Sequence, residues 1–84
     1  MYYVYLIISK TKNSSISYVG YTNNLGKRIK KHNTSKGAKF TKGKKWKLIY
    51  YKKYFSKIMA MKEEYKLKNN YKKRKLIKNL YLSR

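Results

Sequence analysis

Cysteine and proline are absent from this 84-residue chain, and there is a single histidine, His32. Without cysteine the protein can form no disulfide and no thiolate metal site, so we expect no disulfide-linked partner. One histidine is too few for a His-rich zinc site. No proline-rich linker and no repeat divides the sequence, which predicts one domain over residues 1–84 with a small hydrophobic core.

Long hydrophobic segments are also missing. The longest apolar run, Tyr2–Ile8, is far too short to span a bilayer. The beginning of the chain does not have the layout of a signal peptide either. We therefore expect a protein that does not enter the membrane and that works in the cytoplasm.

Acidic residues are scarce beside the basic ones. The chain has 24 Lys and Arg residues, 2 Asp and Glu residues and a formal net charge of +22. An AT-rich genome would explain the preference for lysine over arginine and the 11 tyrosines, but it would not remove Asp and Glu. So much positive charge destabilises a monomer unless a polyanion neutralises it. Nucleic acid is favoured over an anionic membrane, because no long basic amphipathic helix dominates the chain.

Three strands are predicted where aromatic and β-branched residues cluster. Their expected ranges are Tyr2–Ile8, Ile16–Thr22 and Trp46–Phe55. The first two are expected to pair as an antiparallel hairpin around a loop at Ser9–Ser15. A basic loop with one helical turn around Ala38–Thr41 is expected within Thr34–Lys45.

Three helices are predicted from capping residues and spacing. The first should follow a cap at Asn23 or Asn24, and the second should run from about Ser56 to about Lys68. After a break at Asn69 and Asn70, the third should cover about Lys72 to Leu82. The order β-β-α-β-α-α predicts an α+β fold, a small three-stranded sheet flanked by helices.

The first predicted helix carries polar groups on its apolar side. At about 100° per residue, one face holds Leu25, Arg28, Ile29 and His32. The opposite face holds Lys27, Lys30 and Lys31. A helix that directs Arg and His inward together with Leu and Ile indicates a site at the end of a strand–turn–helix unit.

The two carboxylates, Glu63 and Glu64, are adjacent in the second predicted helix. On a helical wheel Glu64 falls inside an apolar arc, and Glu63 falls among lysines. The arc is formed by Ile58, Ala60, Met61, Tyr65 and Leu67. We expect Glu63 at the surface and Glu64 directed inward, where a carboxylate needs a cation. That cation is either Arg28 or a lysine in a buried ion pair, or a hard divalent metal ion such as Mg²⁺.

Four short motifs occur in order along the chain. They are Tyr3-Val4-Tyr5, Tyr18-Val19-Gly20, Leu25-x-x-Arg28-x-x-x-His32 and Ala60-x-x-x-Glu64-x-x-x-Lys68. Together they resemble the GIY-YIG nuclease domain, in particular its small stand-alone members, and are similar to the catalytic module of excision-repair and structure-selective endonucleases. The segment Gly37–Thr41 also resembles the one that these members carry before the third strand.

The resemblance implies a metal-dependent DNA endonuclease with one Mg²⁺ or Mn²⁺ ion and a role in DNA repair or recombination. It implies that Tyr5 is the general base, assisted by His32, and that Tyr18 positions the attacking water. Arg28 would hold the scissile phosphate and Glu64 the metal ion. DNA-binding lysines are expected around this site at Lys27, Lys30, Lys31, Lys39, Lys42, Lys44 and Lys45.

Tyrosine is an unusual base, because with a pKa of about 10 only about a thousandth is ionised at pH 7. We expect the surrounding positive field to favour the phenolate of Tyr5. An arginine suits the phosphate because its planar group binds two oxygens.

Three positions depart from the family pattern: Tyr3 replaces a glycine, Tyr21 stands where the repair enzymes have a lysine, and Leu76 stands where some members have an asparagine. The alternative function is a non-catalytic nucleic-acid-binding protein on the same fold. In that case Arg28 and Glu64 would form a structural ion pair.

Overall fold

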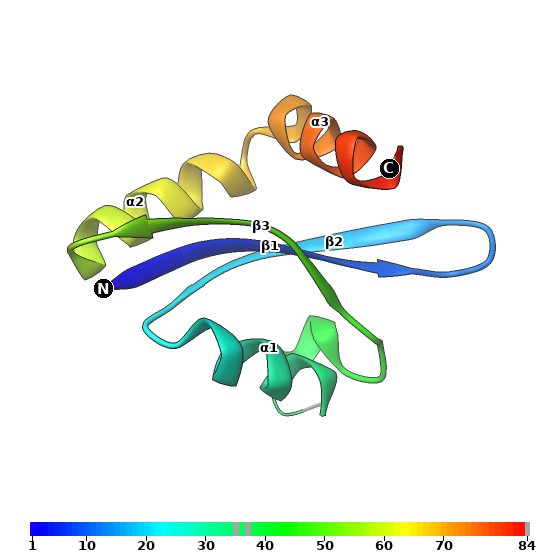
Figure 1. Cartoon of the computed structure of the whole chain (residues 1–84), viewed down its shortest axis with the longest axis horizontal. Helices are drawn as coiled ribbons and strands as arrows, with labels where there is room; N and C mark the ends of the chain where they lie inside the picture. The colour runs from blue at the N-terminus through cyan, green and yellow to red at the C-terminus, as the bar shows by residue number, and fades with distance from the viewer. Residues whose placement is uncertain (35, 37, 84) are drawn as a thin grey trace.

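The chain folds around a three-stranded antiparallel sheet with the strand order β2-β1-β3. The computed structural model describes residues 1–34, 36 and 38–83. The strands are β1 (Tyr2–Lys10), β2 (Ser15–Thr22) and β3 (Lys47–Tyr54). The helices are α1 (Leu25–Asn33), the 3-10 helix η1 (Lys39–Thr41), α2 (Lys57–Lys68) and α3 (Tyr71–Leu82). The predicted α+β fold and its β-β-α-β-α-α order are confirmed (Figure 1).

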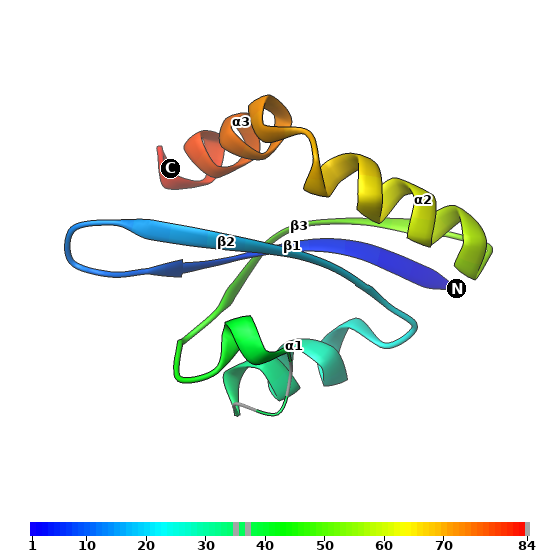
Figure 2. The same cartoon turned by 180° about the vertical axis from the view of Figure 1, so that it is seen from behind.

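β1 is the central strand and is covered on both faces. Helices α2 and α3 lie over one face of the sheet, and α1 with η1 lies over the other (Figures 1 and 2). Residues Val4 to Ile8 are all buried. A continuous apolar run is what a strand buried on both sides requires, since alternate side chains enter opposite layers.

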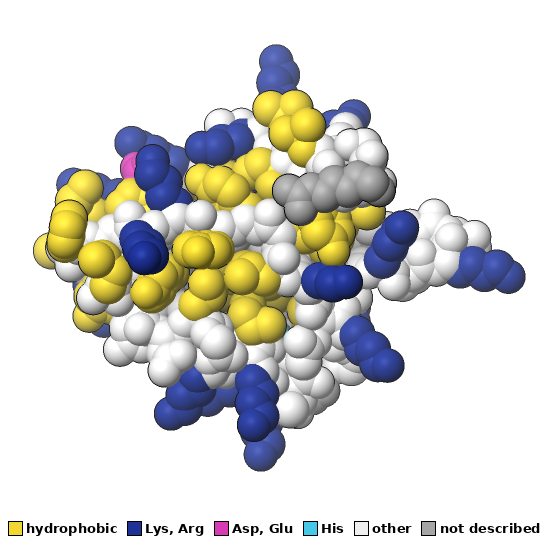
Figure 3. All heavy atoms as spheres, viewed as in Figure 1, with side chains coloured by type: hydrophobic (Ala, Val, Ile, Leu, Met, Phe, Trp, Pro, Cys, Tyr) yellow, Lys and Arg dark blue, Asp and Glu magenta, His cyan; other side chains and the backbone are white. Residues whose placement is uncertain are grey.

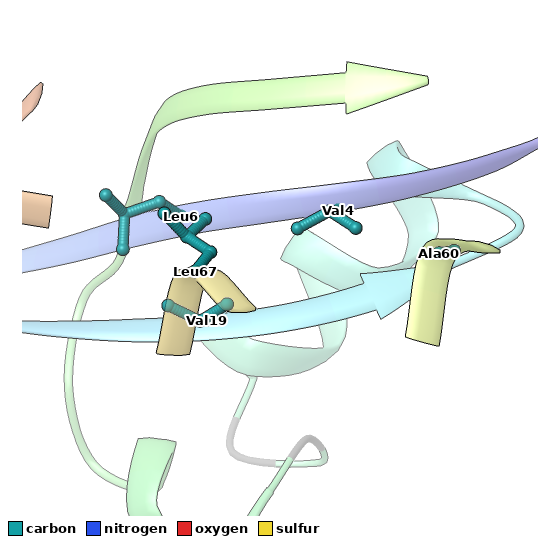
Figure 4. Close-up of a cluster of buried hydrophobic side chains, with 5 residues drawn as sticks. All are labelled: Val4, Leu6, Val19, Ala60 and Leu67. Atoms are coloured by element: carbon teal, nitrogen blue, oxygen red, sulfur yellow. The ribbon is translucent and has the colours of Figure 1, made fainter. Parts of the chain in front are cut away.

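The two layers of the core follow this alternation along β1. Under α2, the buried cluster consists of Val4, Leu6, Val19, Ala60 and Leu67 (Figure 4). Under α1, the buried residues are Tyr5, Ile7 and Trp46, with Leu25 and Ile29 packed against them. Tyr5 therefore belongs to the α1 side of the sheet.

Several predicted boundaries shift by a few residues. The expected loop at Ser9–Ser15 is too long, because β1 continues to Lys10 and β2 begins at Ser15. The turn between them is closed by the backbone N–H of Thr11 donating to the carbonyl of Ser14 at 2.8 Å. This tight closure lets polar residues join the ladder at both strand ends.

The predicted helix caps are confirmed. The side chains of Asn24 and Ser56 accept hydrogen bonds from backbone N–H groups at the starts of α1 and α2. Asn69 ends α2, and the side chain of Asn70 caps α3. Short polar side chains at these positions satisfy N–H groups that have no partner within the helix.

The predicted inward face of α2 is correct at Ala60 and Leu67 and wrong at its three other residues. Ile58 and Tyr65 are 67% and 68% exposed, and Met61 is also exposed. The buried residues of α2 are Ala60 and Leu67, which lie seven positions apart on one stripe. The helical wheel was centred on the larger apolar side chains. In the structure, the small Ala60 side chain is the one that contacts the sheet closely.

A consequence is that both glutamates lie between these two buried residues and are half-buried. Glu63 is thus not simply a surface residue, although it does pair with a lysine of the same helix, Lys66, at 3.2 Å. Within the described residues, no helix combines the length and the apolar character needed to cross a membrane.

Candidate active site

Tyr5 lies directly opposite Gly20 in the β1–β2 ladder, and its ring covers that glycine. A Cβ atom on residue 20 would be 2.3 Å from the Tyr5 hydroxyl oxygen and 2.5 Å from Cζ. A side chain at this position would therefore displace the ring. Because β2 is an edge strand, the arrangement carries the hydroxyl across the ladder toward the edge of the sheet.

Helix α1 brings Arg28 and His32 to the Tyr5 hydroxyl. The hydroxyl lies 2.8 Å from Nε2 of His32, and Nε of Arg28 donates to its oxygen at 3.4 Å. Arg28 is half-buried and His32 is fully buried, while Lys27, Lys30 and Lys31 are exposed. The predicted faces of this helix are therefore those of the structure.

Tyr18 lies beside this group. Its ring packs edge-on against His32, with 5.3 Å between ring centroids, and stacks on Phe40 at 6.1 Å. The edge of the Tyr18 ring also contacts Trp46. Tyr18 thus forms one wall around the imidazole.

The pKa of Tyr5 is raised, contrary to the sequence-based expectation. Burial has the largest effect, and it outweighs Arg28, whose hydrogen bond and charge lower the pKa. The nearby Tyr18 and Glu64 raise the pKa further. The sequence-based expectation considered only the nearby positive charges. It left out the desolvation of the buried phenol, which disfavours the anion.

The pKa of His32 is lowered from its ordinary value of 6.5. Burial is the main cause, and the positive charge of Arg28 acts in the same direction. The imidazole is therefore neutral at pH 7, and one of its ring nitrogens has a free lone pair. A neutral imidazole at 2.8 Å from a phenol is placed to take the phenol proton.

Glu64 lies on α2, which covers the face of the sheet opposite to α1, and it is not among the residues that line the groove at Arg28. The charge of Glu64 also raises the pKa of Tyr5, but less than burial and Tyr18 do. Within the described residues, the salt bridge present joins Glu63 to Lys66, and none joins Glu64 to Arg28. The structural ion pair considered above is thus not formed.

The carboxylate of Glu64 suits a hard divalent cation that takes water and phosphate oxygens as its other ligands. Among the described residues, no group of three or more His, Cys, Asp or Glu side chains gathers to hold a metal ion. Mg²⁺ does not require such a group, because it commonly binds one or two carboxylates together with substrate oxygens. The half-buried carboxylate of Glu64, without a salt-bridge partner in the described chain, fits that role.

An open groove of about 510 Å³ leads to Arg28. Its walls come from the starts of β1, α1 and α2 and from the end of β2. The lining residues are Tyr2, Tyr21, Thr22, Asn23, Asn24, Lys27, Arg28, Lys31 and Lys57. Of the seven predicted DNA-binding lysines, two line this groove, and Lys57 is an additional one that the sequence reasoning did not single out.

The other predicted lysines lie outside the groove. Lys30 is exposed on α1, and a second group surrounds η1 at exposed positions 39, 42, 44 and 45. Lys44 is partly engaged, since its Nζ donates to the carbonyl of Phe40 and lies over the Phe40 ring. Figure 3 shows dark blue basic side chains projecting from the α1 side of the molecule.

The departures from the family motifs have visible environments. Tyr3 packs edge-on against Tyr51 on the neighbouring strand, and Tyr21 lines the groove. Leu76 is 60% exposed on α3, away from the Tyr5 hydroxyl. Gly37, which belongs to the Gly37–Thr41 segment, lies outside the described residues.

Sequence reasoning missed three residues that support the site. Thr41 is fully buried against His32, and Trp46 is buried beside Tyr18. The side chain of Asn33 binds both the backbone N–H and the carbonyl of Trp46. The only sequence signal for Thr41 was its place in the Gly37–Thr41 segment, and nothing in a helical wheel could reveal contacts across that loop.

The fold and this cluster of side chains define a class of protein. The chain belongs to the GIY-YIG catalytic domain family, whose family model matches residues 1–78. This is a nuclease superfamily, and membership supports a nuclease-type function.

Individual relatives cover nearly the whole chain. It is 43% identical over 79 residues to UPF0213 protein OB0043 of Oceanobacillus iheyensis, which spans 90% of this chain and 88% of that protein. It is 44% identical over 77 residues to UPF0213 protein CPE1444 of Clostridium perfringens, over 90% of this chain and 80% of that protein. UPF0213 protein YazA of Bacillus subtilis is 42% identical over 72 residues, which cover 84% of this chain and 72% of that protein. These names state no activity. No solved structure matches the chain significantly.

Proposed function

We propose that this protein is a metal-dependent DNA endonuclease that hydrolyses phosphodiester bonds at the Tyr5–Arg28–His32 group. The observation that carries the proposal is the position of the Tyr5 hydroxyl, which is hydrogen-bonded to a cation donor on one side and to a neutral imidazole on the other. Such a phenol can receive a proton from water as it gives its own proton away.

His32 is needed because Tyr5 by itself is a poor base. Burial raises the pKa of Tyr5, so the phenol stays protonated at neutral pH. In the proposed step, a water molecule loses a proton to the Tyr5 oxygen while the Tyr5 proton passes to Nε2 of His32. The resulting hydroxide attacks phosphorus, and the bond from phosphorus to the leaving oxygen breaks. The leaving oxygen then takes a proton from solvent, and His32 releases its proton to solvent. Tyr18, which packs edge-on against the imidazole, would position the water.

Arg28 binds the scissile phosphate in this proposal. It lines the groove and also covers the buried Tyr5 hydroxyl. Its hydrogen bond to that hydroxyl is 3.4 Å long, which is beyond the usual range. Because this bond is weak, the guanidinium can shift toward a phosphate at little cost. That shift would pair the cation with two phosphate oxygens and open Tyr5 to the attacking water.

Glu64 holds the divalent metal ion, Mg²⁺ or Mn²⁺, in this proposal. When bound, the ion supplies charge stabilisation at the leaving oxygen. The carboxylate of Glu64 is suited to it because it is half-buried and close enough to influence Tyr5.

The substrate is DNA in this proposal, because exposed lysines border the groove and surround η1. Phosphate contacts of this kind do not depend on base sequence. A role in repair or recombination, acting on cytoplasmic DNA, would then follow from the shape of the DNA that is cut. A panel of nicked, flapped, branched and single-stranded DNA with and without Mg²⁺ tests the activity and this choice together.

Glu64→Gln and Glu63→Gln are a matched pair for this assay, since both residues are half-buried on α2 and both changes remove one negative charge. Glu64→Gln should abolish cleavage and also the rise in melting temperature that Mg²⁺ produces by binding the folded state. Glu63→Gln should retain both, although it loses its pairing with Lys66, which is worth at most about 1 kcal/mol, and the charge of its hydrogen bond with Tyr54. DNA binding without cleavage in the wild type, indifferent to Mg²⁺, would instead identify a non-catalytic binder.

A further inference from the structure

Thr41 extends the hydrogen-bond chain beyond His32. Its hydroxyl oxygen lies 2.9 Å from Nδ1 of His32 and 2.7 Å from the carbonyl oxygen of Ala38. Thr41 and His32 are both fully buried, so bulk water does not compete for these contacts. The chain of hydrogen bonds therefore runs from Arg28 through Tyr5, His32 and Thr41 to a backbone carbonyl.

The two ends of this chain fix the direction of every hydrogen bond in it. The carbonyl of Ala38 can only accept, so the Thr41 hydroxyl donates its single hydrogen there. The Thr41 oxygen then accepts, and Nδ1 of His32 must carry the imidazole hydrogen. At the other end the guanidinium of Arg28 can only donate, so the Tyr5 hydrogen is left to point at Nε2.

The opposite tautomer conflicts with the same distances. With the hydrogen on Nε2, the Thr41 hydroxyl would have to donate to Nδ1. Its oxygen would then face the Ala38 carbonyl oxygen at 2.7 Å with no hydrogen between them. The Tyr5 oxygen would receive two donors, and its own hydrogen would lose its acceptor.

Thr41 is held in place by its own backbone contacts. Its N–H donates to the carbonyl of Ala38 at 3.0 Å, and its carbonyl accepts from Nε1 of Trp46 at 2.9 Å. Asn33, the residue after His32, binds the backbone of Trp46 with its side chain. The hydroxyl is thus fixed relative to α1 by a closed set of hydrogen bonds.

We propose that Thr41 is a positioning residue that holds His32 in the Nδ1–H tautomer, so that Nε2 faces Tyr5 as a proton acceptor. The other groups facing the imidazole are Tyr5, Tyr18 and Arg28, and in the described part of the chain the partner of Nδ1 is Thr41. The importance of the tautomer for cleavage rests on the function proposed above, whereas the tautomer itself can be observed without any cleavage.

NMR provides the direct test, because His32 is the only histidine in the chain. Protein labelled with ¹⁵N-histidine has one imidazole, and long-range ¹H–¹⁵N correlations at neutral pH report which ring nitrogen carries the hydrogen. We expect the Nδ1–H form in the wild type. Thr41→Val keeps the side-chain shape without the hydroxyl, and it should shift the ring toward the Nε2–H form that free histidine prefers. Thr41→Ser keeps the hydroxyl and should keep the Nδ1–H form.

The cleavage rates of the same variants link the tautomer to the reaction. General base catalysis contributes about 10²–10⁴-fold, so Thr41→Val should lower the rate at saturating DNA by at least about 10-fold. Thr41→Ser should restore most of it. DNA affinity should be unchanged in both variants, because the hydroxyl is buried away from the groove.

A wild-type Nε2–H tautomer, or an unchanged Nδ1–H tautomer in folded Thr41→Val, would overturn the assignment. Should Thr41→Val fail to fold, Thr41→Ser decides: retention of the wild-type tautomer and rate supports the proposal, and loss of either contradicts it. A wild type that has the Nδ1–H tautomer but cuts no DNA would refute the endonuclease and leave the role of Thr41 in fixing the ring intact.

Discussion

Gly20 determines where the Tyr5 side chain can lie. The conformation of residue 20 places no special demand on glycine, and what excludes a side chain is the Tyr5 phenol, whose hydroxyl oxygen lies 2.3 Å from the place of a Cβ atom. The glycine of the Tyr18-Val19-Gly20 motif is therefore explained by contact across the strand pair. It allows a large aromatic residue to cover the ladder and to meet two residues of α1 at its hydroxyl.

Gly20→Ala should abolish most cleavage, because the added methyl group moves the Tyr5 ring away from His32. Overpacking of a buried position costs about 1–3 kcal/mol, so the variant should still fold. The matched control is Gly26→Ala, since Gly26 lies in α1 with nothing within 4 Å of its Cβ position. That change should leave cleavage intact and stabilise the helix by about 0.5–1 kcal/mol. Equal activity in the two variants, measured beside their melting temperatures, would contradict this role of Gly20.

Arg28→Lys should recover little of the activity lost in Arg28→Ala. Lysine keeps the positive charge but offers no planar pair of donors for a phosphate and no Nε–H at the Tyr5 hydroxyl. DNA affinity should fall only modestly in both variants, since Lys27, Lys31 and Lys57 share the groove. Single-turnover cleavage at saturating DNA separates these effects. Wild-type rates in Arg28→Lys would show that position 28 contributes charge alone.

At the scale of elements, both helices lie close to their expected ranges, but the buried face was predicted fully for α1 and only in part for α2. The face of α1 was correct because its cap, Asn24, and its mixture of inward Arg and His with outward lysines define one phase. In α2 the phase is set by Ala60 and Leu67, while larger apolar residues such as Tyr65 remain exposed. Size and hydrophobicity mislead where a small residue makes the close contact with a sheet.

The connection through η1 shows a second limit of sequence reasoning. A helical turn near residues 38–41 was expected, and η1 is there. Its contribution to the site depends on a hydroxyl that meets His32 across a loop. Likewise, the pKa of Tyr5 depends on burial as well as on nearby charge, and only the packed structure shows that burial has the larger effect.

The burial of His32, a residue of α1 that contacts Thr41 of η1, should make stability depend on pH. Burial and then Arg28 lower the pKa of His32 below its unfolded value of 6.5, so the unfolded chain binds a proton more readily. The stability from the neutral imidazole is complete above about pH 6.5 and is lost as the pH falls through the folded pKa. Urea unfolding midpoints should therefore decrease from about pH 7 to about pH 5.

His32→Gln is the control for this dependence. The chain has no other histidine, which is the residue type whose ordinary pKa lies in that interval. The variant should be less stable at neutral pH, because Tyr5 and Thr41 lose their partner. Its midpoint should change little between about pH 7 and about pH 5. A wild-type midpoint that is flat over the same interval would show that His32 is not held neutral by the fold.

At the scale of the whole molecule, the net charge is +22, and basic side chains are scattered around the face shown in Figure 3. The groove concentrates part of it at one end of the β1–β2 hairpin, near Thr22, where α1 and α2 begin. The turn of the hairpin lies at the opposite end, since Lys10 pairs with Ser15 there and Tyr3 pairs with Thr22 at the groove. Lysine variants at the two ends of the hairpin can therefore test whether DNA affinity depends on the position of the charge or only on its total amount.

Affinity for duplex DNA should fall steeply with salt. Each neutralised phosphate contributes about −0.9 to the slope of log affinity against log salt concentration, and we expect a slope of magnitude at least about 4. Replacing Lys27 and Lys31 together by Gln should reduce that magnitude by about 2, because both line the groove. Replacing Lys10 and Lys12, at the far turn, removes the same charge and should leave the slope nearly unchanged (Figure 1). Equal losses in the two double variants would mean that DNA contacts the molecule without regard to the groove, and the proposed position of the phosphate beside Arg28 would then have to be abandoned.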